Sequence, residues 1–146
     1  MRQPRYVYVT YIATTPEKLW HAITDADLSA RYWGHANISD WRVSSRWEHR
    51  RIDGSREADI VGTVVESDPP RRLVMSWASP GEADQPEKVS RVTFAIEPHK
   101  EGSIKLVVTH SELEAGSSME RGITQGWPWV LSSLKSFLET GKGLPL

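Results

Sequence analysis

The sequence contains no cysteine among its 146 residues. This absence excludes disulfide bonds, thiolate nucleophiles and thiolate metal ligands, and it agrees with a reducing compartment. The N-terminal residues alternate polar and apolar side chains, and no hydrophobic run approaches the roughly 20 residues of a membrane-spanning helix, so we expect a cytoplasmic protein with no membrane insertion. The formal net charge is only -1. Such a balance supplies no positive field for phosphate backbones, so nucleic acid is not an expected partner.

The sequence also lacks the motifs of several enzyme classes. It has no G-x-S-x-G elbow, no P-loop and no G-x-G-x-x-G fingerprint, so hydrolytic, nucleotide and dinucleotide chemistry lack their usual local geometry. The five histidines show no i, i+4 pair and no nearby Glu-x-x-His arrangement, and we expect neither a metal nor another cofactor. The pattern therefore favours binding over a recognisable bond chemistry, and we assign no catalytic residue.

Tryptophan, by contrast, is abundant, with seven residues in the chain. A packed aromatic side chain buries about 150–250 Å² of surface, so these indoles require a substantial core around them. Apolar residues make up 38% of the sequence and charged residues 25%, which is typical of a globular protein. At this length we predict one domain that spans residues 1–146.

The order of the predicted elements indicates an α+β fold. A β-branched and aromatic run predicts a strand over residues 5–12, and two short helices follow, the first beginning at Thr15-Pro16 and the second covering 27–33. Short strands separated by turn signals occupy 38–79, and two clear strands cover 88–97 and 103–113. Apolar residues at helical spacing predict the longest helix over 117–140, ended by Gly141.

This order predicts a helix-grip architecture. A curved, mostly antiparallel sheet of about six to seven strands should wrap on the long C-terminal helix, because no other element is long and apolar enough to cover it. Asp53-Gly54 predicts a two-residue hairpin turn with positive φ angles. A helix laid across a concave sheet leaves a gap, and the functional question is whether indoles fill that gap or line a pocket.

Several residues on the inward faces are candidates for the wall of such a pocket. Tryptophans at inward positions suit an aromatic cage for a planar ligand, although core packing explains them equally well. His110 lies on the apolar face of its strand, where it is either a hydrogen-bond donor or general base, or a core histidine bonded to a neighbour. His49 alternates with Trp47 and suits either a polar contact to the ligand or an exposed edge position. The predicted cavity residues are Trp33, Trp47, His49, Trp77, Phe94, His110, Met119, Trp127 and Leu131.

The sequence GWPWVLSSLKSFLETG over residues 126–141 resembles the closing helix of the heat-shock-protein-90 ATPase activator-like branch of the START-like (SRPBCC) superfamily. Other landmarks of that branch occur in order, namely PEKLW at 16–20, YW at 32–33, GTVVE at 62–66, DPPRRL at 68–73 and THS at 109–111. The resemblance covers nearly the whole chain and implies the helix-grip fold. Members of the superfamily bind lipids, steroids or aromatic polyketides, some cyclise polyketides, and the branch is named for a co-chaperone domain.

Three functions follow as hypotheses. The first is non-catalytic binding of a small hydrophobic or aromatic molecule in a cavity between the sheet and the C-terminal helix. The second is a polyketide cyclase or aromatase, in which the same cavity folds a reactive chain and a histidine moves a proton. The third is a co-chaperone-like interaction with a chaperone or a second copy of the chain, for which Trp129, placed opposite the apolar stripe of its helix, is a candidate anchor.

Overall fold

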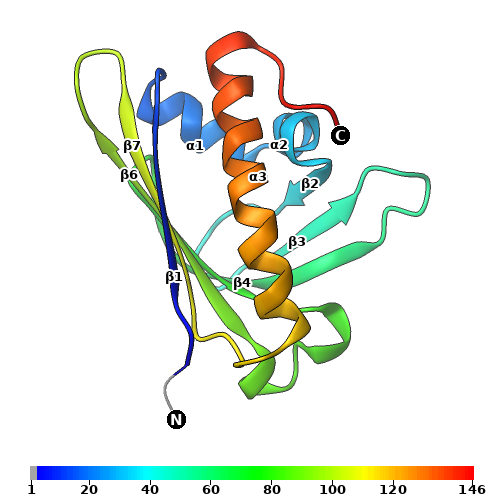
Figure 1. Cartoon of the computed structure of the whole chain (residues 1–146). Helices are drawn as coiled ribbons and strands as arrows, with labels where there is room; N and C mark the ends of the chain where they lie inside the picture. The colour runs from blue at the N-terminus through cyan, green and yellow to red at the C-terminus, as the bar shows by residue number, and fades with distance from the viewer. Residues whose placement is uncertain (1–2) are drawn as a thin grey trace.

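The computed structural model describes residues 3–146, which fold as one curved sheet crossed by a long helix (Figure 1). The sheet order is β1-β7-β6-β5-β4-β3-β2, and every neighbouring pair is antiparallel. The strands are β1 (Tyr6–Ile12), β2 (His35–Ile38), β3 (Arg46–Arg51), β4 (Ala58–Asp68), β5 (Arg72–Trp77), β6 (Ser90–Pro98) and β7 (Ile104–Ser111). The helices are α1 (Pro16–Thr24), α2 (Ala26–Trp33) and α3 (Ser118–Thr140), with 3-10 turns η1 (Pro80–Glu82) and η2 (Pro86–Lys88). This architecture confirms the predicted α+β helix-grip fold.

The helix ends lie where their capping residues predict. Thr15 accepts a hydrogen bond from the Lys18 backbone N–H and begins α1. Asp25 ends α1 and also caps α2, since its carboxylate accepts from the Leu28 backbone N–H. Gly141 ends α3 with a left-handed φ of 88°. These local signals define the two short helices and the long one before any tertiary contact is considered.

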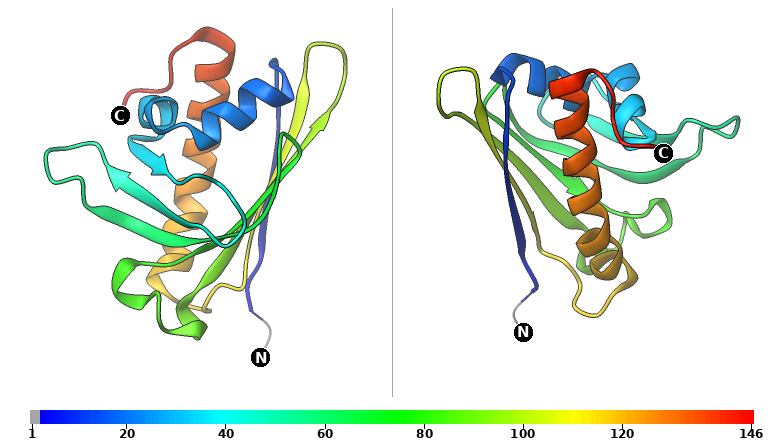
Figure 2. Two further views of the ribbon diagram at one scale, coloured as in Figure 1. Left: turned by 180° about the vertical axis from the view of Figure 1, so that it is seen from behind. Right: turned by 45° about the horizontal axis from the view of Figure 1, so that its top comes forward.

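Helix α3 lies across the concave face of the sheet, as the views in Figure 2 show. Its inner face packs apolar side chains such as Trp127, Leu131 and Leu134 against buried strand residues. Near its C-terminal end, the Lys135 ammonium donates to the Tyr11 carbonyl at 2.6 Å. These contacts hold the helix over the sheet. Within residues 3–146, no helix is long and apolar enough to cross a membrane.

The β3–β4 hairpin forms as predicted, but its turn does not. The prediction of a two-residue turn at Asp53-Gly54 is wrong. Strand β3 ends at Arg51 and β4 begins at Ala58, and the positive φ angle is at Arg56 instead. The Asp53 carboxylate accepts from the Ser55 backbone N–H at 3.0 Å, which builds a wider loop around the aspartate.

Helix α2 is joined to α3 by a short polar contact that positions the end of α2. The Ser133 hydroxyl of α3 donates to the Tyr32 carbonyl at 2.6 Å and accepts from the Leu144 backbone N–H at 2.9 Å. Gly143 allows the C-terminal segment to lie close to Tyr32, because an added Cβ would be only 2.9 Å from the Tyr32 Cα. Trp33, the last residue of α2, is therefore held beside the sheet and α3.

Candidate functional site

Three indoles from three different elements meet beside α3. Trp33 ends α2, Trp77 ends β5, and Trp127 lies on the inner face of α3. The ring centroids are 5.5 Å apart for Trp33 and Trp127, 5.6 Å for Trp77 and Trp127, and 6.4 Å for Trp33 and Trp77. These distances are those of packed aromatic pairs. We call Trp33, Trp77 and Trp127 the indole cluster.

The indole cluster forms the wall of a pocket of about 130 Å³ that opens beside α3. No charged side chain lines this pocket, whose walls are Trp33, Trp77, Gly122, Ile123, Gly126, Trp127 and Val130. Two of these residues are glycines one helical turn apart, and a Cβ added to either would meet nothing within 4 Å. Gly122 and Gly126 therefore leave the space in front of the indole cluster open.

The interior beneath the cluster is occupied by other predicted site residues. Trp47 is fully buried, its ring centroid lies 5.4 Å from that of Trp77, and its N–H donates to the Ser76 carbonyl at 2.8 Å. Phe94 meets Trp127 edge to face at 5.9 Å, and Leu131 is buried nearby in the same core. These three side chains are therefore packed in the core, whereas the indole cluster borders the pocket.

His110 is part of a series of buried hydrogen bonds that runs from Trp127 through Ser90 to the Trp77 carbonyl. The Trp127 N–H donates to Nδ1 of His110 at 3.0 Å, and an indole nitrogen can only donate, so this Nδ1 carries no proton. Nε2 then carries the proton and lies 2.8 Å from the Ser90 hydroxyl, which itself donates to the Trp77 carbonyl at 3.0 Å. Burial lowers the pKa of His110 to about 4. The imidazole is neutral, and both of its nitrogens are already bonded within the protein.

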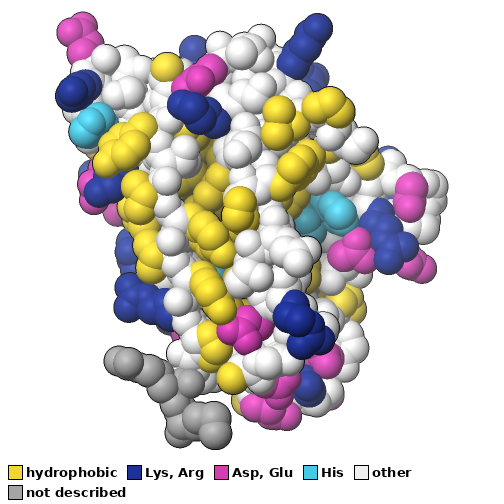
Figure 3. All heavy atoms as spheres, in the orientation of Figure 1, with side chains coloured by type: hydrophobic (Ala, Val, Ile, Leu, Met, Phe, Trp, Pro, Cys, Tyr) yellow, Lys and Arg dark blue, Asp and Glu magenta, His cyan; other side chains and the backbone are white. Residues whose placement is uncertain are grey.

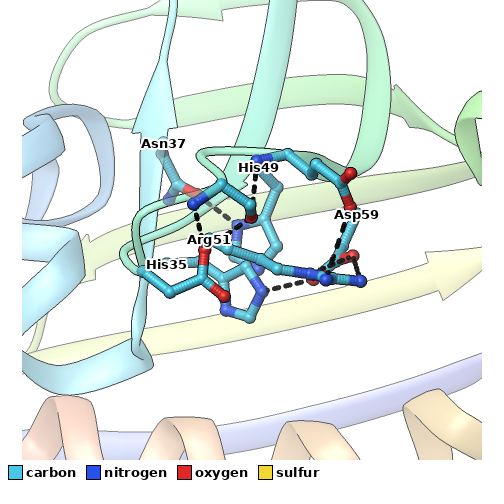
Figure 4. Close-up of polar contacts among 8 residues, drawn as sticks. His35, Asn37, His49, Arg51 and Asp59 are labelled. Carbon is cyan, nitrogen blue, oxygen red and sulfur yellow. Dashed lines mark hydrogen bonds and ion pairs between the residues drawn. The ribbon is translucent and has the colours of Figure 1, made fainter.

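His49 belongs to a second polar cluster, on β2, β3 and β4 (Figure 4). Its Nδ1 lies 2.6 Å from the Asn37 side-chain oxygen, and its ring stacks on His35 with centroids 4.2 Å apart. His35 Nε2 in turn lies 2.8 Å from the Asp59 carboxylate, which also binds Arg51. Burial, followed by the neighbouring His35 charge, lowers the pKa of His49 to about 3.

The His49 ring also packs against the indole cluster. Its centroid lies 4.7 Å from that of Trp33 and 6.0 Å from that of Trp77. Asn37 orients His49, because its amide N–H donates to the Ile23 carbonyl and leaves its oxygen to accept from the imidazole. His49 is therefore neutral and buried behind the pocket wall.

The structure brings together only part of the predicted set at this pocket. Trp33, Trp77 and Trp127 line it, whereas Met119 lies at a separate polar hollow with Ser90 and Leu113 near the start of α3. The sequence reasoning missed the pocket residues Gly122, Ile123, Gly126 and Val130. The sequence did offer a signal for Gly122 and Gly126, because two glycines four residues apart inside a helix lower its helix propensity.

Within the part of the chain that the structure describes, no group of three or more histidine or acidic side chains is placed to hold a metal ion. His35 and Asp59 are hydrogen-bonded to each other, and Asp59 also binds Arg51. The pocket itself offers apolar contact with aromatic rings.

A curved antiparallel sheet closed by one long C-terminal helix defines a helix-grip protein of the START-like superfamily. Residues 13–139 match the family described as "Activator of Hsp90 ATPase homolog 1-like protein". Because this match spans most of the sequence, the chain belongs to that family. No curated protein matches the sequence significantly.

Solved structures share the fold at low sequence identity. The Aha1 dimer from Colwellia psychrerythraea is 22% identical with a TM-score of 0.78, over 96% of this chain and 99% of that one. The HSP90 activator PFC0360w from Plasmodium falciparum is 22% identical with a TM-score of 0.70, over 84% and 86%. CalU16 from Micromonospora echinospora is 20% identical with a TM-score of 0.73, over 95% and 78%. At these identities the likeness is one of fold.

Proposed function

We propose that the protein binds a small apolar or aromatic molecule at the indole cluster. The observation that carries this proposal is the uncharged pocket of about 130 Å³ between three tryptophans and two helical glycines. Ligand sites are typically concave and apolar with aromatic walls, and this pocket has those properties. The sequence predicted a cavity between the sheet and the C-terminal helix, and this pocket has residues of α3, α2 and β5 in its wall.

The pocket volume limits the part of the ligand that it encloses. An apolar cavity of roughly 150 Å³ accommodates a benzene ring, so about one ring fits against the indole cluster. A ligand of eight to ten non-hydrogen atoms should bind with a dissociation constant on the order of 0.1–1 mM. A larger natural ligand would extend from the pocket over Gly122 and Gly126.

This proposal is tested by titrating the protein with single-ring aromatic compounds and following the indole N–H resonances by NMR. Gly126→Leu should place a side chain in the pocket mouth and weaken binding at least tenfold. Gln125→Leu adds the same side chain at the neighbouring exposed position of α3 and should leave binding unchanged. Unchanged binding by the Gly126→Leu protein, or no binding by the wild-type protein, would contradict the proposal.

The geometry gives less support to the cyclase or aromatase alternative. A general base needs a free lone pair within reach of the substrate. The Nδ1 lone pair of His110 is held by Trp127, and Nε2 must carry the proton, so His110 is a structural histidine in this arrangement. His49 lies behind the pocket wall rather than on it.

A co-chaperone-like interaction is a second candidate, favoured by the family and by Trp129. This indole is 38% exposed on the outer side of α3, where a large aromatic side chain is a suitable interface anchor. Figure 3 shows further apolar side chains along β1 and α3 on one face of the molecule. Trp129→Ser should weaken a complex with a heat-shock-protein-90 homologue at least tenfold and remove any stimulation of its ATPase, while Gln125→Leu serves as the control. If the wild-type protein neither binds that homologue nor changes its ATPase rate, the co-chaperone function is excluded. Measuring the molecular mass of the wild-type protein alone in solution tests whether it forms a homodimer.

A further inference from the structure

We propose that the ligand of the indole cluster is an uncharged molecule with a hydrogen-bond acceptor, and that the acceptor binds the indole N–H of Trp77. This inference rests on the proposed ligand-binding function and narrows it to a chemical class. Ketones, aldehydes, esters and ethers of ring size belong to that class, whereas carboxylates, ammonium compounds and pure hydrocarbons do not.

The three buried indole nitrogens of the core differ in their hydrogen bonding. The Trp47 N–H donates to the Ser76 carbonyl and the Trp127 N–H donates to His110, so both have protein partners. The N–H of Trp77 is buried as well, yet no group among residues 3–146 accepts it. Trp77 itself is only 5% exposed. A buried donor without a partner destabilises a protein, and most such groups in native structures have an explanation.

The Trp77 N–H and the pocket lining together select the chemistry of the ligand. An indole nitrogen only donates, so its missing partner must be an acceptor. The residues that line the pocket carry no charge, and an ionised ligand would lose its hydration there without gaining an ionic partner. The two histidines behind the pocket are neutral and hydrogen-bonded, and they supply no counter-ion. An uncharged oxygen acceptor satisfies both conditions.

The Trp77 ring lines the pocket, and its N–H is buried. For a ligand oxygen to reach this N–H, a neighbouring ring must turn aside. Trp33 is the ring suited to this movement, because it is only partly buried and stacks over Trp77 with a centroid distance of 6.4 Å. Its own N–H makes no hydrogen bond within the described part of the chain that would hold the ring in place.

The test compares three probes of similar size, namely acetophenone, isopropylbenzene and benzoate, by NMR titration of the wild-type protein. We expect acetophenone to bind about tenfold more tightly than isopropylbenzene and benzoate not to bind. Acetophenone should also shift the Trp77 indole N–H resonance downfield, as hydrogen bonding does, whereas isopropylbenzene should not. In Trp77→Phe, which keeps an aromatic ring but lacks the N–H, the preference for acetophenone should disappear.

The outcomes separate this inference from the proposed function. Equal binding of acetophenone and isopropylbenzene, or a retained preference in Trp77→Phe, overturns the inference and leaves the apolar pocket as a binding site. Binding of neither neutral probe overturns both. If Trp77→Phe does not fold, the wild-type resonance, assigned through its contacts with the rings of Trp33 and Trp127, still decides whether the N–H meets the acceptor.

Discussion

Trp47 and Gly62 pair across β3 and β4, and the position of the tryptophan depends on the missing side chain of the glycine. The Trp47 indole lies over Gly62 and donates to the Ser76 carbonyl on β5. A Cβ at position 62 would collide with the Ser76 carbonyl oxygen and lie 2.5 Å from Trp47 Nε1. Glycine is therefore required here for close approach, not for an unusual backbone angle.

Replacement of Gly62 by alanine should destabilise the protein by about 3 kcal/mol, because neither the backbone carbonyl nor the packed indole can move freely. Urea unfolding followed by tryptophan fluorescence measures this loss. Gly54→Ala is the matched control, since an added Cβ there meets nothing within 4 Å, and it should change stability by less than about 0.5 kcal/mol. Equal stabilities of the two variants would show that the close contact is not energetically important.

For single residues, the sequence pattern predicted burial but not hydrogen-bond partners. Alternation correctly placed Phe94 and His110 on the buried faces of their strands, because side chains on a strand point alternately to its two faces. The same reasoning left the partners of His110 open, since Ser90 and Trp127 lie 20 and 17 positions away in sequence. Such partners depend on strand register and helix placement, which a local pattern does not specify.

At the scale of elements, α3 combines a strong apolar stripe with two glycines on the pocket side. Its start at Ser117, its end at Gly141 and its buried residues follow from capping and periodicity, so they were predictable. Gly122 and Gly126 weaken the helix, yet the structure shows no contact that requires them. Their open surroundings are what the proposed binding site would need.

Gly126→Ala should stabilise the protein by about 0.5–1 kcal/mol, because alanine is the better helix former and its Cβ would enter open space. Thermal unfolding should show a higher midpoint. Binding of a single-ring ligand should fall by no more than a few fold, since a methyl group occupies little of the pocket. A lower midpoint would mean that Gly126 is in closer contact with its surroundings than the structure shows.

At the scale of the whole molecule, two neutral histidines buried in the core link stability to pH. Folding lowers the pKa of His49 to about 3 and that of His110 to about 4, from 6.5. As pH falls below 6.5, the unfolded chain binds protons that the folded chain does not, so the stability present above 6.5 is progressively lost. Between pH 7 and 5 each histidine should remove about 2 kcal/mol from the free energy of unfolding.

Urea unfolding at pH 7, 6 and 5 measures this dependence. His110→Gln should roughly halve the slope, whatever its effect on stability at pH 7, because one of the two histidines no longer titrates. Gly54→Ala, which removes no titratable group, should leave the slope unchanged. A flat profile between pH 6.5 and 5 in the wild-type protein would contradict the neutral, buried state of both histidines.

The sequence by itself determined the order of the elements, the antiparallel sheet, the covering helix and the buried faces. Capping, alternation and helical periodicity are local properties, and the motifs that resemble the family agree with them. Only the tertiary structure decided that Trp47 and Phe94 are buried in the core while Trp33, Trp77 and Trp127 border a pocket. The reason is physical: burial of an indole can be predicted from its face, but residual volume depends on how side chains from distant elements pack together.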